Sequence, residues 1–290
     1  DPHPVLLRVL TFLAGLVLLP VALVALLLAL LQSESARLWA EMAVDRLVPG
    51  VRIDGLGPGL PARLDLARVE LVDGEGTWLS VDGIDVRWHP SALFAGKLDV
   101  DRIAAARLAL PRTPAGAPEP AEPAPEPAPG EPFRLPESVF PVRVETIAVE
   151  RIELGAPVLG GRAAVFTLDG RLDAASGTAA ALDLALTRLD RAGLEATVDA
   201  SLELAARRLE LRVAVDERSG LLTGLTGEPA LAPLTVELAG TGPLADWPGR
   251  LEVGAGDLAT LTSEVRLTLE AAPRLALDGR ITPGPALAST

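Results

Sequence analysis

Residues 209–215 read LELRVAV, a stretch in which large aliphatic side chains alternate with charged or small ones. Successive side chains of a β-strand point to opposite faces of the sheet, so this alternation gives a strand with one dry face and one wet face. A helix would need apolar residues three or four positions apart. The stretch therefore predicts a half-buried β-strand.

The same period of two recurs along the chain outside this stretch. It is found in LDL at 64–66, IDVRW at 84–88, LDLAL at 182–186, LTVEL at 234–238 and VRLTL at 265–269. We therefore predict a mainly β chain: a long, curved, antiparallel-type sheet with an apolar, groove-like inner face and short connector helices. No long helical pattern follows residue 50, which excludes doubly wound α/β folds and their nucleotide sites.

Short turn signals separate the predicted strands. They occur at residues 73–74, 82–83, 169–170, 176–177 and 192–193, and all but the last two pairs are Asp-Gly. Residues 90–96 follow the pattern of a short helix, because a proline at the start suits a first helical turn.

The N-terminal part of the chain carries an uncharged run of 23 residues, 9–31. As a helix this run would be about 34 Å long, enough for a hydrocarbon core of about 30 Å. We predict a signal-anchor transmembrane helix over 1–33 and a short amphipathic helix over 34–50. A cleaved signal peptide and a buried core helix are the alternatives. The large remainder would be translocated, which places the bulk of the chain outside the cytoplasm.

The rest of the chain divides by composition into three segments. We predict a first β segment over 51–110, a disordered loop over 111–136 and a continuing β segment over 137–290. The middle segment is rich in Pro, Ala and Glu, and proline lacks the N–H group that a sheet requires. We expect the loop to interrupt one sheet. The chain begins with Asp1 and not with Met, which suggests a longer parent protein.

Composition excludes several classes of function. The chain holds 26 basic against 39 acidic residues, a formal charge of −13, and only 3% aromatics, which disfavours nucleic-acid binding. It has no cysteine and two histidines, His3 and His89, which are far apart in the sequence. A triad or a zinc site needs ligands or proton carriers that gather together. We predict no catalytic residue, no metal site and no cofactor, and hence no enzyme.

The candidate binding site is the apolar face of the sheet. The alternation places nine aliphatic residues on it: Leu182, Leu184, Leu186, Leu209, Leu211, Val213, Leu234, Val236 and Leu238. Their polar neighbours Asp183, Glu210, Arg212 and Glu237 would face water. The sequence leaves open whether this face is an open groove for lipid chains or the closed core of a sandwich.

The order of several motifs resembles the N-terminal region of the TamB family, in the AsmA-like superfamily. These motifs are LVDGEGTWL at 71–79, VRWHPSAL at 86–93, GKLDVDRI at 96–103, LALPR at 108–112 and GTGPLADW at 240–247. The resemblance implies a single-pass inner-membrane anchor, a long periplasmic β-structure with a hydrophobic groove, and no catalytic residues. The chain departs from the family's pattern at His89, where a basic residue is more usual, and it lacks the family's C-terminal region.

The resemblance implies a function in lipid transport. We expect phospholipid to be conducted towards the outer membrane, with support of outer-membrane protein assembly. The partners would be phospholipid, the inner membrane and a TamA-like outer-membrane barrel, met through the C-terminal region absent here. The alternative is a scaffold or chaperone for β-barrel clients, which would use the same apolar face or free sheet edges. A secreted sandwich-type adhesin is disfavoured by the predicted anchor.

Overall fold

The computed structural model describes residues 50–57, 59, 61–115, 139–221, 233–268 and 274–288. The predicted anchor at 1–33, nearly all of the predicted helix at 34–50, and most of the loop at 111–136 lie outside these ranges. No helix among the described residues is long and apolar enough to cross a membrane. The chain divides into two compact units, Asp1–Ile53 and Asp54–Thr290, and nearly all of the described residues belong to the second.

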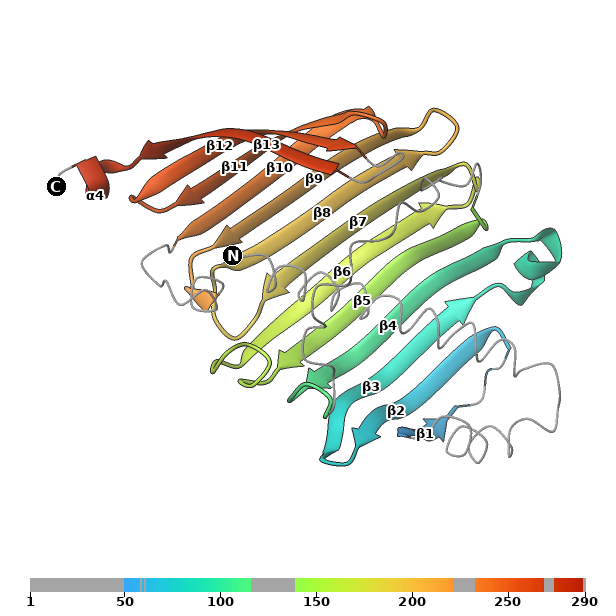
Figure 1. The fold of residues 1–290 in the computed structure, drawn as a ribbon. Helices are drawn as coiled ribbons and strands as arrows, with labels where there is room; N and C mark the ends of the chain where they lie inside the picture. The colour runs from blue at the N-terminus through green and yellow to red at the C-terminus, as the bar shows by residue number, and fades with distance from the viewer. Residues whose placement is uncertain are drawn as a thin grey trace. The chain divides into compact units, whose positions relative to one another are not determined.

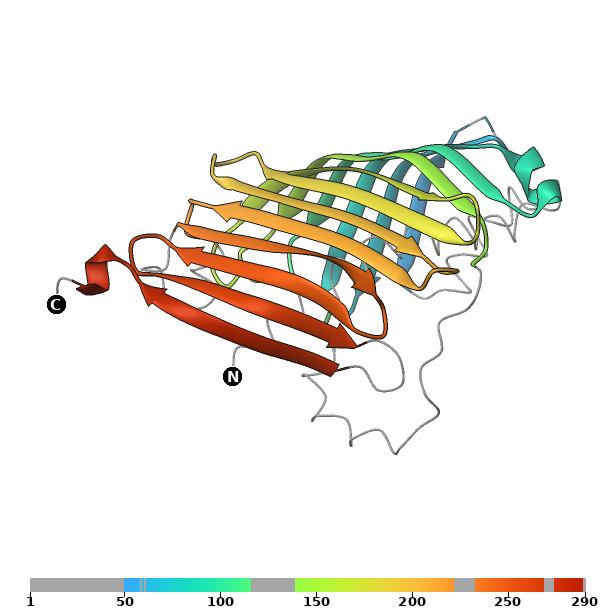
Figure 2. The same cartoon turned by 90° about the horizontal axis from the view of Figure 1, so that it is seen from above.

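The described residues form one sheet of thirteen strands, and the strands lie side by side in their order along the chain (Figure 1). Seen from above, successive strands are rotated relative to one another, the usual twist of an open sheet (Figure 2). The first six strands are β1 (Val51–Leu56), β2 (Arg63–Asp73), β3 (Gly76–Trp88), β4 (Leu98–Leu110), β5 (Val142–Leu154) and β6 (Ala164–Ala174).

The remaining strands are more uniform in length. They are β7 (Ala179–Arg188), β8 (Leu194–Glu203), β9 (Arg208–Glu217), β10 (Leu234–Pro243), β11 (Trp247–Ala255), β12 (Ala259–Thr268) and β13 (Arg274–Pro283). Two short helices accompany them, the 3-10 helix η1 (Pro90–Ala95) and α4 (Pro285–Ala288). The prediction of a mainly β chain with short connector helices is thus confirmed. Each alternating stretch named above lies in a strand, except that Leu269 is outside the described residues.

Most neighbouring strands form antiparallel hairpins with short turns. In the turn between β2 and β3, the Asp73 carboxylate accepts a hydrogen bond from the Glu75 N–H at 2.8 Å. The turn between β6 and β7 contains the expected Ser176 and Gly177, the latter with a φ of 69°. The turns predicted at 82–83 and 169–170 are wrong, because these residues lie inside β3 and β6.

The pairing of β4 with β5 is parallel, which makes the sheet mixed and corrects the antiparallel-type prediction. The pairing runs from Leu98 beside Val142 to Leu110 beside Leu154. Parallel neighbours need a crossover that returns to the starting end, whereas a hairpin reverses in place. Residues 111–141 connect the two strands, so the Pro-rich segment belongs to this crossover, and the same sheet continues on both sides of it.

The crossover is tethered at its first residues. Arg112 donates two hydrogen bonds to the Asp73 carboxylate, at 2.9 and 2.5 Å, and one to the Gly76 carbonyl oxygen at 2.8 Å. The guanidinium group of Arg112 holds the pKa of Asp73 well below its usual range. Residues 111–115, the start of the segment predicted as a disordered loop, are therefore held beside the β2–β3 turn, where the Ala115 N–H also donates to Asp73.

An unbroken apolar row crosses the sheet from β2 to β13. Residues directly opposite each other in neighbouring strands have side chains on the same face. Twelve such partners, one in each described strand from β2 onward, are all apolar: Leu66, Ile84, Ala105, Val149, Leu168, Leu186, Ala196, Val215, Val236, Val253, Leu261 and Ile281. At about 4.8 Å between strands, the row is about 50 Å long.

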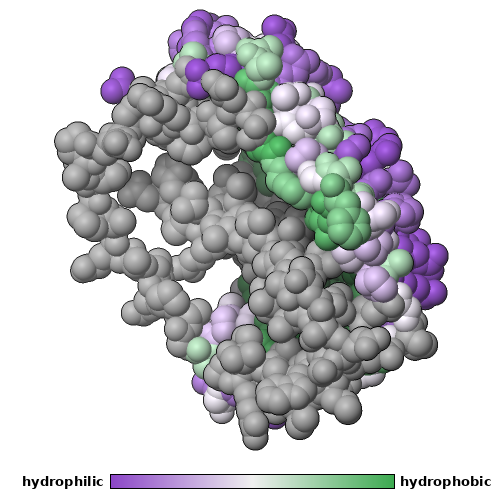
Figure 3. Space-filling model, turned by 90° about the vertical axis from the view of Figure 1, so that its right-hand side faces the viewer, coloured by the Kyte–Doolittle hydropathy of each residue, from purple (hydrophilic) through white to green (hydrophobic). Residues whose placement is uncertain are grey.

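Burial of this face decreases along the chain. Most of the buried apolar residues lie in β2–β6, where Val100 and Leu110 are each 1% exposed. The face is half-buried over much of β7–β12, and in the last strand Leu275, Leu277 and Ile281 are 62%, 58% and 68% exposed. Apolar residues gather on one side of the described sheet and charged residues on the other (Figure 3).

Candidate functional site

The nine aliphatic residues predicted to line a groove lie on one face of β7, β9 and β10. Strand β8 contributes the residues between them, so that Leu184, Val198, Val213 and Leu238 form one row and Leu186, Ala196, Val215 and Val236 form the next. Leu182 and Leu211 flank Ala200 in a third row. The alternation read from the sequence therefore places these side chains on a common surface.

All nine of these side chains are half-buried. Their neighbours on the opposite face, Glu210, Arg212 and Glu237, are exposed, while Asp183 is half-buried and pairs with Arg171 at 2.5 Å. A side chain in a closed core is usually almost fully buried. The surface formed by the nine residues, here called the aliphatic face, is thus intermediate between a closed core and free surface.

Trp247 closes one end of the aliphatic face, and it is not among the site residues predicted from the sequence. It is 1% exposed, and its indole N–H donates to the Leu209 carbonyl oxygen at 3.0 Å. The ring lies over Gly240 and Gly249, because a Cβ atom at either position would come within 2.6 Å of it. The signal in the sequence is the pair of glycines in the apolar phase of two neighbouring strands.

Two charged residues interrupt the apolar phase. Arg188 is opposite Phe166, and Glu217 lies between Leu194 and Leu234. Both are buried, and one carboxylate oxygen of Glu217 has no hydrogen-bond partner. Sequence reasoning missed them because each stands at the end of a strand. The available signal was their spacing, because each lies an even number of residues after the leucines or valines that face the same side of its strand.

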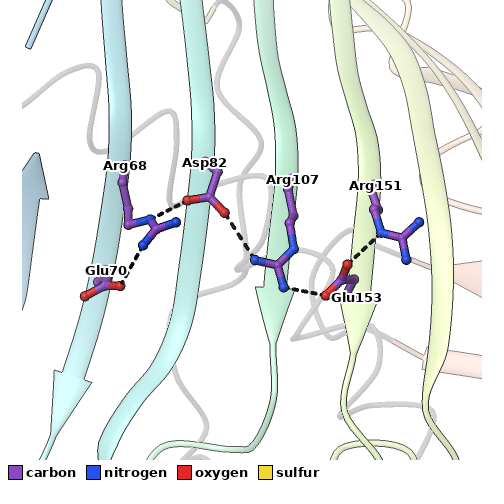
Figure 4. Close-up of polar contacts among 6 residues, drawn as sticks. All are labelled: Arg68, Glu70, Asp82, Arg107, Arg151 and Glu153. Atoms are coloured by element: carbon purple, nitrogen blue, oxygen red, sulfur yellow. Dashed lines mark hydrogen bonds and ion pairs between the residues drawn. The ribbon is translucent and has the colours of Figure 1, made fainter. Parts of the chain in front are cut away.

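The opposite face of β2–β5 carries an ion-pair ladder (Figure 4). Asp82 pairs with Arg68 at 2.5 Å and with Arg107 at 3.2 Å, and Glu153 pairs with Arg107 and Arg151, each at 2.6 Å. The two guanidinium groups lower the pKa of Glu153 to about 2. The ladder joins four strands through side chains that are all in ion pairs, an arrangement that crosslinks the sheet.

His89 lies away from the aliphatic face, at the start of η1. Its Nε2 is 2.9 Å from an Asp101 carboxylate oxygen, and its backbone N–H donates to the Asp99 carbonyl oxygen at 2.8 Å. Within the described ranges, no group of three His, Asp or Glu side chains is placed to hold a metal ion. The predictions of no catalytic residue and no cofactor stay predictions.

The chain was also compared with known proteins. No family model, no curated protein and no solved structure matches it. The resemblance to the TamB family therefore rests on the motifs in the sequence alone.

Proposed function

We propose that this chain is an inner-membrane-anchored periplasmic bridge protein that conducts phospholipid towards the outer membrane and supports outer-membrane protein assembly with a TamA-like barrel. The observation that carries the proposal is the unbroken apolar row from Leu66 to Ile281. A sheet in a globular domain normally buries its apolar face against a second layer of secondary structure. Here the main contacts of each described strand are with its neighbours in the sheet, and the aliphatic face stays half-buried.

Acyl chains suit such a surface for physical reasons. Removing apolar area from water stabilises a complex by about 25 cal/mol per Å², whatever the shape of the partner. Leu, Val and Ala side chains give a wall without polar groups that would fix one orientation. A row about 50 Å long without a polar interruption also lets a chain slide between equivalent positions, since each step exchanges one aliphatic contact for another.

A second candidate is a scaffold or chaperone for β-barrel clients, and the edge strand β13 favours it. Leu275, Leu277 and Ile281 are exposed, and β12 is the one described neighbour of β13. An exposed edge with apolar side chains can pair with another extended chain.

Lipid extraction followed by mass spectrometry of the purified chain tests the proposal. We expect copurifying phospholipid in a fixed molar ratio after detergent exchange. Absence of phospholipid, together with retained binding of an unfolded β-barrel segment, would favour the scaffold and contradict the conduit.

A further inference from the structure

A polar recess lies at one margin of the aliphatic face, where β7 and β9 end and β6 begins. Its lining residues are Arg162, Ala163, Arg188, Asp190, Arg191 and Ser219. The recess adjoins the apolar surface directly, because Arg188 faces the buried Phe166 and follows Leu186 by two residues in the same strand. An amphiphile on the aliphatic face could therefore reach it without leaving the sheet.

The inner wall of the recess is built from a buried arginine and its partners. The Arg188 side chain is 6% exposed and donates to Asp190 at 2.9 and 2.8 Å and to the Ser219 hydroxyl at 2.9 Å. Ser219 donates in turn to Glu217 at 2.6 Å. Asp190 also accepts a hydrogen bond from the Val165 N–H at 2.8 Å. These bonds hold Arg188 in one position, so its charge is fixed at the end of an apolar row.

The outer wall carries two exposed guanidinium groups. Arg162 donates to the Gly220 carbonyl oxygen at 3.1 Å and has no carboxylate partner among the described residues. Arg191 likewise has no ion pair within the described part of the chain. The lining holds three positive groups and one carboxylate, and the Glu217 carboxylate lies behind Ser219. The recess therefore has a local excess of one positive charge in a chain whose formal charge is −13.

We propose that this recess binds the phosphate group of a phospholipid whose acyl chains lie on the aliphatic face. The proposal rests on the proposed function and adds a headgroup site to it. Guanidinium groups suit phosphate oxygens because they donate pairs of parallel N–H bonds. Arg162 and Arg191 have free donors for this task, while Arg188 supplies fixed charge behind them. The acyl chains would then run from the row of Leu168 and Leu186 towards Trp247.

The test compares two double variants of the full chain, delipidated and kept soluble in an amphipathic polymer. Arg162→Gln/Arg191→Gln removes both outer donors, and Arg208→Gln/Arg274→Gln removes two exposed charges elsewhere on the sheet. The probes are a short-chain phosphatidylglycerol below its micellar concentration, the diacylglycerol with the same chains, and inorganic phosphate. Calorimetry gives each Kd.

We expect the recess variant to bind the phospholipid at least tenfold more weakly than the wild type, with diacylglycerol binding unchanged and the control variant like the wild type. Equal phospholipid affinity in all three proteins would overturn the headgroup site and leave the conduit standing. Inorganic phosphate that binds as tightly as the phospholipid, and is lost in the recess variant alone, would identify a free anion as the ligand and also overturn it. A wild type that binds neither lipid would contradict the conduit itself.

Discussion

Strands β2–β6 and strands β7–β13 build the same apolar face in two different ways. In β2–β6 the pairings contain register shifts, at Leu71/Val72, Arg87/Trp88, Val144/Ile147 and Val149/Ile152, and most of the buried apolar residues lie there. From the β6–β7 pairing onward the registers of the described strands run without a shift, and the face is largely half-buried. The ion-pair ladder also belongs to the first region.

The difference teaches how one sheet can combine a stable part with an adaptable one. Bulges and the parallel pair bend and fix β2–β6, whereas the regular ladder of β7–β13 repeats one surface without change. A charge introduced on the apolar face should therefore have opposite consequences in the two regions. It should unfold the first and leave the second folded but unable to bind apolar cargo.

The largest expected effect is that of Leu110→Asp in β4. The side chain is 1% exposed, so the variant buries an unpaired charge and should lose more than about 4 kcal/mol of unfolding free energy. Urea unfolding followed by circular dichroism measures this. The control is Thr146→Asp on β5, an exposed position beside Arg102, which should change stability by less than about 0.5 kcal/mol. A folded Leu110→Asp variant would remove the distinction between the two regions.

Trp247→Ala should be the most damaging truncation in the second region. Removing the indole empties the space over Gly240 and Gly249 and leaves the Leu209 carbonyl oxygen without its donor, at a cost of about 3–5 kcal/mol. Trp247→Phe loses the same hydrogen bond and the outer indole atoms that lie over the glycines, but it fills part of the space. It should therefore cost less than the alanine variant, about 2 kcal/mol. Equal losses in the two variants would show that the hydrogen bond, and not the packing, holds this end.

Leu211→Asp separates folding from binding on the aliphatic face. Leu211 is half-buried, so the charge reaches water, and we expect a loss of about 1–2 kcal/mol with the fold retained. Bound lipid should fall at least tenfold, because acyl chains would desolvate the carboxylate. Thr197→Asp, exposed on the opposite face of β8, is the control and should keep its lipid. An unfolded Leu211→Asp variant would indicate a closed core, and a folded one with undiminished lipid would contradict the conduit.

Glu153→Gln should lower the unfolding free energy only slightly, by about 1 kcal/mol, because partly exposed ion pairs contribute little to stability. The folded-state pKa of Glu153 is lowered from 4.5 to about 2, so its contribution is present above about pH 4.5 and is lost as the pH falls towards 2. The difference in unfolding free energy between wild type and variant should shrink over that window. A difference that is constant with pH would show that the ladder adds no stability through ionisation.

Deleting residues 117–126 should have the smallest effect, below about 0.5 kcal/mol, because loop-closure entropy varies only with the logarithm of length. The parallel pairing sets a limit, however. The connection must span one strand of 13 residues, about 40 Å, which takes at least about 12 extended residues. A longer deletion, of residues 117–136, would leave fewer residues than this connection needs. Thermal unfolding of both deletions tests this, and equal stability would contradict the parallel register.

Local patterns in the sequence predicted much of the fold, and non-local ones did not. LELRVAV at 209–215 predicts its strand because period two is written in adjacent residues. Asp82-Gly83 has the composition of a turn, yet Gly83 takes a φ of 63° inside β3 and avoids Ala106 of β4. Similarly, Gly170 makes room for Leu184 inside β6. The parallel register across residues 111–141 depends on partners far apart, which no local motif encodes.

The candidate site was predicted in its apolar part alone. The nine residues were found because burial selects one parity along a strand. Arg188 and Glu217 have that same parity, but a charge at a strand end is usually solvated, and only the neighbouring segments at Asp190 and Ser219 give these groups their partners. A buried polar network is a property of several chain segments, so periodicity in any one of them cannot reveal it.

The agreement between strand order and chain order has a consequence for cooperativity. Each described strand depends mainly on two neighbours, so unfolding free energy should add up along one dimension, as in repeat proteins, without a single global value. Opening can begin at β13, whose apolar side chains are exposed, and advance strand by strand towards β7. Amide hydrogen exchange should then show protection that rises in steps from the C-terminal strands to β4 and β5, where the crossover joins segments that no hairpin connects.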